Sequence, residues 1–128
     1  MAYLLDKGIQ LIRDVENEKA IKILQQVLEE DPHNAEVYRH LGLAFFNLGN
    51  YSRAKSHWNR CVELEPQHHQ TWWNLGQVNE VLNDFERAIE AYEKAVLSVE
   101  KKYPEKAIRY REWVKKAKEN RKRLLTDI

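Results

Sequence analysis

Cysteine, glycine and proline are scarce in this sequence: one cysteine, four glycines and three prolines occur among 128 residues. The lone Cys61 cannot form an internal disulfide, so nothing ties the fold to an oxidising compartment. No apolar run approaches the roughly 20 residues that cross a bilayer. Asp6 and Lys7 lie where a secretory signal would need its apolar stretch. We therefore expect a cytoplasmic protein that does not enter a membrane.

Motifs of the common enzyme classes are also absent. The sequence contains no glycine-rich phosphate loop, nucleophile elbow, His-Glu-x-x-His helix or paired-cysteine zinc spacing. His57 and Cys61 stand four residues apart on one predicted helix face, but a zinc site needs three or four ligands. Cys61 also aligns with Val27 and Ala95 at the period described below, which favours a packed apolar role. We expect no enzymatic activity, no metal and no cofactor.

Length and composition are typical of one folded helical domain. Apolar residues make up 43% of the sequence and charged residues 32%. The formal net charge is +1, but residues 1–102 carry −4 and residues 103–128 carry +5. This asymmetry marks the last segment as a separate element.

A period of 34 residues runs through the first 102 residues. It aligns small residues with small ones and large residues with large ones: Gly8, Gly42 and Gly76; Ala20, Ala54 and Ala88; Leu24, Trp58 and Tyr92. Within a unit the apolar residues recur at i, i+3, i+4 and i+7 in two separate stripes, which predicts a pair of helices. The small residues let the two helices approach closely, and the large side chain fills the space beside them. A single pair cannot bury its apolar faces, so the pairs must stack.

The period predicts how the chain is organised. The units are residues 1–34, 35–68 and 69–102, and a basic capping helix follows over residues 103–128; together they form one domain. Gly49 is expected to end one helix of the second unit, because glycine adopts the left-handed conformation easily.

Two irregularities interrupt the pattern. Val15 replaces the turn glycine in the divergent first unit, and a β-branched residue disfavours positive φ. We expect that turn to be rebuilt or frayed. Glu100 stands where Pro66 closes the second unit, so the last helix of the third unit is predicted to run about one turn longer, to near Tyr103.

Two of the units resemble the tetratricopeptide repeat family, whose signature is Trp-x2-Leu-Gly followed by Tyr, Ala, Phe, Ala and Pro over 34 residues. The matching residues are Tyr38, Leu41, Gly42, Phe45, Ala54, Trp58, Cys61 and Pro66, and then Trp72, Leu75, Gly76, Ala88, Tyr92 and Ala95. The resemblance implies an all-α fold, a right-handed superhelical stack of antiparallel helix pairs with about seven helices. It also implies a scaffold or adaptor that holds a peptide or protein partner in its concave groove.

The resemblance places the ligand on the first helix of each pair. The positions that face away from the packing stripe give the candidate peptide-binding residues: Arg39, His40, Phe46, Asn47, Trp73, Asn74, Gln77 and Arg111. Amides can bond a peptide backbone, rings can hold an apolar side chain, and arginines can pair with a carboxylate. Trp73 has two interpretations, an exposed ligand anchor or a ring packed against neighbouring helices. Arg111 faces the groove in both registers considered for the last helix.

One known groove of this family, the carboxylate clamp for the C-terminal tails of heat-shock chaperones, uses lysine, asparagine and arginine at fixed positions. In this sequence those positions hold Leu5, Ile9, His40, Gln70 and Asn74. A clamp for two carboxylates is therefore not expected, and chaperone tails are disfavoured as ligands.

The basic helix over residues 105–125 has two interpretations. Its simplest role is a solvating cap on the last repeat. Its lysines and arginines could instead attract an acidic partner or nucleic acid, although nucleic acid is disfavoured because the whole chain is nearly neutral. The leading hypothesis is a scaffold that binds a protein or peptide. The alternative is a structural module that forms homo-oligomers through its uncapped first repeat and its basic last helix.

Overall fold

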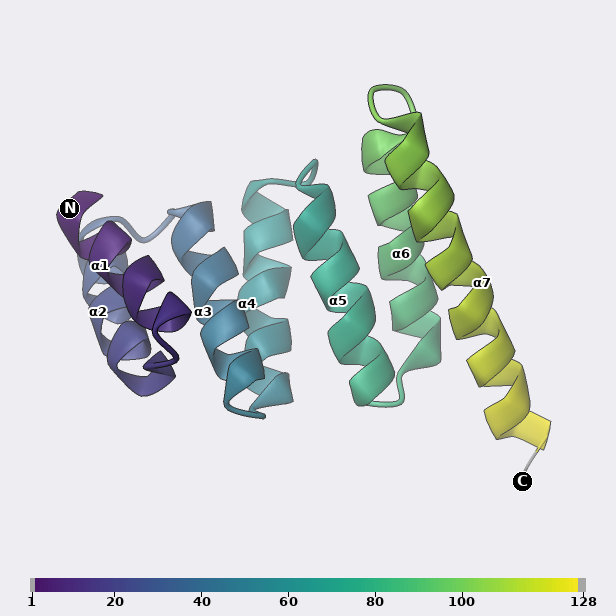
Figure 1. The fold of residues 1–128 in the computed structure, drawn as a ribbon, viewed down its shortest axis with the longest axis horizontal. Coiled ribbons are helices and arrows are strands. Elements are labelled where there is room, and N and C mark those ends of the chain that lie inside the picture. Colours follow the sequence, from purple (N-terminus) through teal and green to yellow (C-terminus); the bar gives the residue numbers. More distant parts are fainter. Residues whose placement is uncertain (1, 127–128) are drawn as a thin grey trace. The chain divides into compact units, whose positions relative to one another are not determined.

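The computed structural model describes residues 2–126, and within them the chain forms seven α-helices and no strand (Figure 1). The helices are α1 (Ala2–Arg13), α2 (Asn17–Glu30), α3 (Ala35–Asn47), α4 (Tyr51–Leu64), α5 (His69–Val81), α6 (Phe85–Val99) and α7 (Pro104–Thr126). The predicted all-α fold of helix pairs is confirmed. The chain divides into two compact units, Met1–Pro66 with α1 to α4 and Gln67–Ile128 with α5 to α7.

In the first unit, α1 pairs with α2 and α3 pairs with α4, while α2 also packs against α3. The close approach of α3 and α4 depends on Gly42, because a Cβ atom at this position would overlap the indole of Trp58. Trp58 is buried, and its indole Nε1–H donates to the carbonyl oxygen of Arg39 at 3.0 Å. The predicted pairing of a small residue with a large ring is therefore realised here, with a hydrogen bond that orients the ring.

In the second unit, α6 packs against both α5 and α7. Gly76 repeats the role of Gly42, since a Cβ atom there would overlap the ring of Tyr92. The fully buried Tyr92 donates its hydroxyl to Glu80 Oε1 at 2.6 Å and accepts from Gln77. Burial, and then the bond to Glu80, raises the pKa of Tyr92 well above its ordinary value. The ring therefore stays neutral and serves as packing and donor.

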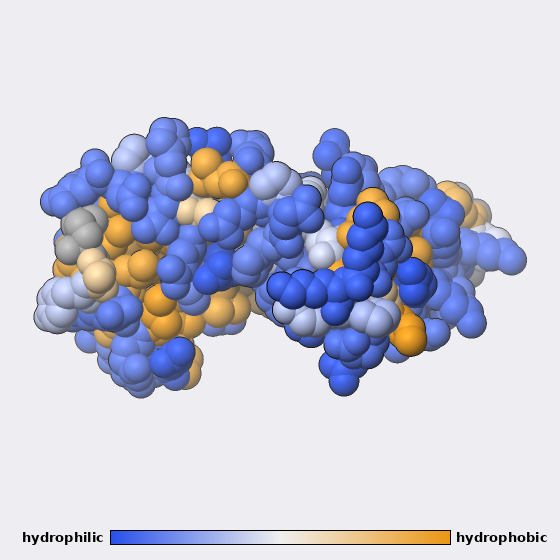
Figure 2. Space-filling view, turned by 90° about the horizontal axis from the view of Figure 1, so that it is seen from above, coloured by the Kyte–Doolittle hydropathy of each residue, from blue (hydrophilic) through white to orange (hydrophobic). Residues whose placement is uncertain are grey.

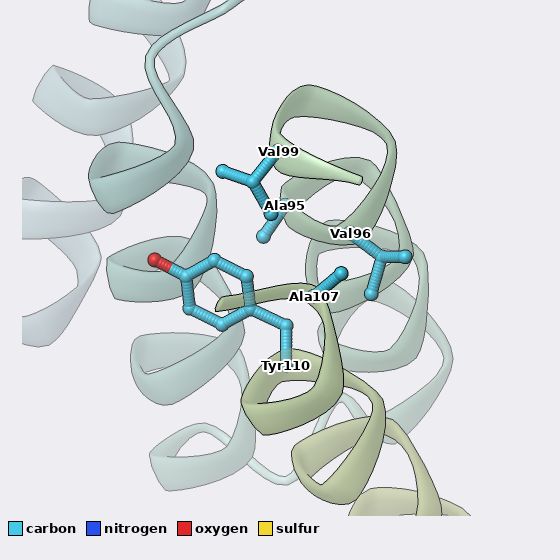
Figure 3. Packing of buried hydrophobic residues seen from close by; sticks show 5 residues of the cluster. All are labelled: Ala95, Val96, Val99, Ala107 and Tyr110. Atoms are coloured by element: carbon cyan, nitrogen blue, oxygen red, sulfur yellow. The ribbon is translucent and has the colours of Figure 1, made fainter. Parts of the chain in front are cut away.

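The docking of α7 depends on a second apolar cluster, shown in Figure 3. Ala95, Val96 and Val99 of α6 meet Ala107 and Tyr110 of α7 in this cluster. The alanines keep the two helices close, and the Tyr110 ring covers them. Figure 3 also shows the Tyr110 hydroxyl pointing away from the cluster.

The three turns inside the helix pairs share one backbone geometry. Val15, Gly49 and Asn83, spaced by 34 residues, have φ values of 61°, 77° and 61°. In each turn the next amide bonds a carbonyl five residues back, as Glu16 bonds Leu11 at 2.8 Å. The expectation that the Val15 turn is rebuilt or frayed was wrong, because this bonding pattern holds the valine in the left-handed region.

The end of α6 also differs from the sequence prediction. The helix ends at Val99, one residue beyond the position equivalent to the end of α4, and not near Tyr103. A short turn follows, in which the Tyr103 amide bonds the Val99 carbonyl at 2.7 Å. Pro104 then begins α7, where proline costs no helical hydrogen bond.

Candidate functional site

A hollow of about 270 Å³ opens on the second unit between the N-terminal halves of α5 and of α7. Three residues of α5 and four of α7 line it: His69, Gln70, Trp73, Lys106, Arg109, Tyr110 and Trp113. The α7 residues recur at i, i+3, i+4 and i+7, so they form one face of that helix. We refer to this feature as the α5–α7 hollow.

Two tryptophans form the apolar wall of the α5–α7 hollow. The rings of Trp73 and Trp113 meet edge to face, with centroids 6.0 Å apart and an interplanar angle of 81°. Trp113 also lies 6.1 Å from the buried ring of Tyr92. Both tryptophans are half-buried, because they pack on the cluster of Ala88, Ile89, Tyr92 and Ala117 and still reach the hollow. The core thus fixes the orientation of the rings that a ligand would meet.

A hydrogen bond joins the first residue of α5 to α7 in this hollow. His69 Nδ1 and the Tyr110 hydroxyl lie 2.7 Å apart. Burial first, and then the charges of Lys106 and His68, lower the pKa of His69 below its ordinary value. Burial raises the pKa of Tyr110. A neutral imidazole nitrogen can accept a hydrogen bond from the tyrosine hydroxyl, so the bond positions both rings while both stay uncharged.

The charged groups on this hollow are all basic. Lys106 and Arg109 line it, and none of its lining residues is acidic. Lys106 also lies 4.6 Å above the ring of Tyr103, while Arg109 is exposed and makes no ion pair within residues 2–126. Two cations beside an aromatic wall suit a ligand that combines an apolar group with a carboxylate.

In the first unit, the candidate residues predicted from the sequence lie on α3. Arg39 and His40 both approach Glu36 Oε1, at 3.8 and 3.9 Å. Burial, followed by the charge of Arg39, lowers the pKa of His40. Phe46 is half-buried, with its ring 5.1 Å from Tyr51 and 5.7 Å from Trp58.

Two of the three predicted amides already have partners. Asn47 is exposed, and its side-chain amide donates to Asn17 Oδ1 at 3.1 Å. Gln77 is half-buried and donates to the Tyr92 hydroxyl. A peptide would have to replace these bonds or accept from the second amide hydrogen. Asn74 is half-buried on α5.

Trp73 and Arg111 do not line the same hollow. Trp73 lies in the α5–α7 hollow, whereas Arg111 bonds Glu100 Oε2 at 3.3 Å and lines other depressions on α6 and α7. The positive charge beside Trp73 comes from Lys106 and Arg109, and not from Arg111 as predicted.

Of the seven lining residues, only Trp73 was among the candidate peptide-binding residues predicted from the sequence. The others are two residues of α5, His69 and Gln70, and four residues of α7: Lys106, Arg109, Tyr110 and Trp113. The signal for the α7 residues lies in the spacing of the helices. The first helices of successive pairs begin at Ala35 and His69, but α7 begins at Pro104, 35 residues later. Counting from that proline, which often opens a helix, aligns Arg109 with Asn74 and would have indicated that one of the four.

Two further features were considered in the sequence, a metal site and a membrane span, and residues 2–126 bear on both. No group of three or more His, Cys, Asp or Glu is arranged there to hold a metal ion. His57 Nδ1 lies 2.9 Å from the Arg53 carbonyl, and Cys61 is buried. Within the same residues, no helix combines the length and hydropathy that a bilayer span requires.

Known proteins provide an independent comparison. A family model described as tetratricopeptide repeat matches residues 41–107, and a second, described as TPR repeat, matches residues 16–49. A TPR repeat-containing protein of Pseudomonas aeruginosa is 30% identical over 76 residues, which cover 59% of this chain and 72% of that protein. The Hsp70-Hsp90 organizing protein of Triticum aestivum is 24% identical over 88 residues, 69% of this chain. The chain spans only 15% of the length of that wheat protein.

Solved structures show the same fold. The type III secretion chaperone SycD of Yersinia enterocolitica, in complex with a peptide of the translocator YopD, aligns with a TM-score of 0.85 at 14% identity, covering 93% of this chain and 92% of that one. The first TPR domain of Spaghetti (RPAP3), bound to the HSP90 peptide SRMEEVD, aligns with a TM-score of 0.80 at 19% identity and covers 93% of each chain. With its 34-residue period, its glycine–aromatic helix pairs and a family model matched over more than half its length, the chain belongs to the tetratricopeptide repeat family.

Proposed function

We propose that this chain is a protein-interaction module that binds a peptide segment of a partner and catalyses no reaction. The observation that carries the proposal is the α5–α7 hollow, in which an aromatic wall lies beside two cations. The proteins of the two aligned structures hold peptides, which supports the same class of ligand here. We place this function in the cytoplasm.

The size of the hollow favours side chains over a whole small molecule. Ligand pockets for drug-sized molecules are typically about 300–1,000 Å³, and this hollow holds about 270 Å³. One large apolar side chain can fill it against Trp73 and Trp113. A carboxylate on a neighbouring peptide residue then reaches Arg109 or Lys106, where a charge-assisted hydrogen bond is stronger than a neutral one.

The sequence-derived contacts remain part of the proposal, with different weights. On α3 we propose Arg39, His40, Phe46 and Asn47 as contacts of the first unit. On α5 we propose Asn74 next to Trp73. Gln77 and Arg111 carry less weight, because Gln77 already bonds Tyr92 and Arg111 already bonds Glu100.

The expected ligand differs from a heat-shock chaperone tail. Leu5 and Ile9 cannot donate to a carboxylate, and burial keeps the pKa of His40 low, so it offers no positive charge at neutral pH. We therefore expect the peptide SRMEEVD, which the RPAP3 domain binds, to show no measurable affinity for this chain. Saturable binding of that peptide would contradict the proposal that this chain lacks a carboxylate clamp and binds a different class of peptide.

A selection from random peptides tests the proposal directly. Peptides displayed on phage are selected on the intact chain, and the affinity of each winner is measured for Trp73→Ala, Arg109→Ala and the control Arg123→Ala. We expect Trp73→Ala and Arg109→Ala each to weaken binding at least tenfold, about 1.4 kcal/mol, and the control to leave it unchanged. Arg109 is exposed, so its replacement preserves folding even if Trp73→Ala does not. The proposed function is refuted if no peptide is selected, or if the selected peptides bind Trp73→Ala and Arg109→Ala as tightly as the parent chain.

A further inference from the structure

The opposite side of α7 carries a second surface that shares no residue with the α5–α7 hollow. Two shallow depressions lie there, of about 260 and 430 Å³. The first is lined by Glu93, Val96, Leu97, Arg111 and Val114, and the second by Arg111, Val114, Lys115, Lys118, Glu119 and Lys122. They share Arg111 and Val114, so they form one continuous surface, which we call the outer face.

The outer face includes exposed apolar side chains. Leu97 of α6 is 64% exposed and Ile108 of α7 is 62% exposed. Ile108 lies three residues before Arg111 and so continues the same stripe of α7. Figure 3 shows Val96 on the far side of Ala107 from the Tyr110 ring, toward this surface. Figure 2 shows small orange patches among mostly hydrophilic atoms on the side of the second unit, and a broader apolar area on the side of the first. A cap that only solvates the last repeat has no need of such patches.

The repeat itself indicates what kind of element belongs on this face. Gly42 and Gly76 are each the eighth residue of their helix, and each faces the large ring of the helix that follows. The eighth residue of α7 is Arg111, which is exposed. A further helix is therefore the natural neighbour of this face, but the arginine keeps it farther away and offers it a charge in place of a glycine contact.

The charges of the outer face fit an acidic helix. Arg111, Lys115, Lys118 and Lys122 recur at i, i+4, i+7 and i+11 and extend over about 16 Å at 1.5 Å per residue. The three lysines make no ion pair within residues 2–126. Glu93 and Glu119 line this face, and Glu100 pairs with Arg111 at 3.3 Å, so a partner carboxylate would take the place of Glu100 there. Carboxylates at the same spacing on a partner helix can meet all four cations. Nucleic acid fits less well, because phosphates gain nothing from the apolar strip of Leu97 and Val114.

We propose that the outer face docks an acidic amphipathic helix of a partner protein. Its apolar side chains pack on Leu97, Ile108 and Val114, and its carboxylates pair with Arg111, Lys115 and Lys118. This interaction shares no residue with the α5–α7 hollow, and Arg111 is the one residue it has in common with the contacts proposed for peptide binding, so each can fail without the other.

Two synthetic helices of about 18 residues, long enough to span the stripe, test the proposal on the intact chain. Both carry leucine at i, i+3, i+4 and i+7; one has glutamate and the other lysine at the remaining positions. Fluorescence anisotropy at about 0.15 M salt, where long-range attraction is screened, is expected to show saturable binding of the acidic helix only. Leu97→Asp and Arg111→Glu/Lys118→Glu should each weaken it at least tenfold, and Trp73→Ala should not.

A charge-matched control decides between a docking surface and general attraction. Lys7→Glu/Lys22→Glu changes the net charge as much as Arg111→Glu/Lys118→Glu does, at exposed residues of the first unit. The proposal requires this control to bind like the parent chain. It is overturned if the control loses as much affinity, if Leu97→Asp has no effect, or if single-stranded DNA displaces the acidic helix at equal concentration. Sedimentation that shows a dimer abolished by Leu97→Asp would assign the face to a second copy and overturn it as well.

Discussion

Replacing Val15 by glycine is expected to stabilise the first unit. Val15 has a φ of 61°, in the left-handed region that only glycine, and less readily asparagine, adopts without strain. The equivalent residues of the other turns are Gly49 and Asn83, which suit the same conformation. The valine side chain is 79% exposed, so its removal forfeits little apolar burial.

The magnitude follows from two opposing contributions. A side chain in the left-handed region costs about 1–2 kcal/mol, and the β-branch of valine places this residue toward the upper value. The glycine variant loses about 0.5–1 kcal/mol of this gain, because its unfolded state has more conformational freedom to lose on folding. The net gain for Val15→Gly is therefore about 1 kcal/mol, which corresponds to a rise in Tm of roughly 4–8 °C for a cooperative unit of this size.

Urea and thermal unfolding followed by circular dichroism provide the measurement, and Gly49→Val is the matched reverse change. A Cβ at Gly49 would meet no atom within 4 Å, so that variant reports the cost of the backbone conformation alone. We expect it to destabilise the chain by about 1 kcal/mol, which is the Val15→Gly effect with the opposite sign. If Val15→Gly has the stability of the parent chain while Gly49→Val is destabilised, the Val15 turn does not carry the strain assigned to it, and the reasoning fails.

Three further predictions concern stability. Asn79→Leu should stabilise the second unit by about 1–2 kcal/mol in urea unfolding, because Asn79 is buried with its Oδ1 unpaired within the described residues; an unchanged midpoint would mean that the oxygen is solvated. Gly76→Ala should cost about 2 kcal/mol, since the methyl group would overlap the Tyr92 ring, and a neutral result would show that the ring can move. Burial lowers the pKa of His40 and of His69, so the unfolded chain binds these protons more tightly and stability should fall below about pH 6.5. Unfolding midpoints at neutral and mildly acid pH measure this loss, which His40→Gln/His69→Gln should reduce.

The helix pairs were predictable from the sequence because their determinants repeat. Gly42 and Gly76 recur at the period together with the rings that they face, so periodicity alone identified both contacts. The Val15 turn was mispredicted for a physical reason: intrinsic preference disfavours valine there, but the flanking helices impose the turn, and its hydrogen bonds outweigh the local strain.

The candidate site was less predictable, because it depends on a contact outside the period. The sequence left two interpretations of Trp73 open, an exposed anchor and a ring packed on neighbouring helices, because its exposure depends on what α7 places against it. That residue is Trp113, whose ring lies 6.0 Å away. The extra residue before Pro104 rotates α7 by about 100° relative to a strict 34-residue register. The 34-residue period does not predict that rotation, because the extra residue lies outside the repeats.

The same rotation decides what the positive charge of the last helix means. Residues 103–128 carry a net charge of +5, but the sum does not tell on which side of the helix each charge lies. Both interpretations of the basic helix started from that sum. Six of the nine cations of α7 form two groups, with Lys106 and Arg109 beside the aromatic wall and Arg111 with three lysines on the outer face. The two groups lie on different sides of one helix, so a ligand that neutralises one leaves the other exposed. Charge reversals in the two groups should therefore impair different partners, which a single electrostatic function for α7 does not allow.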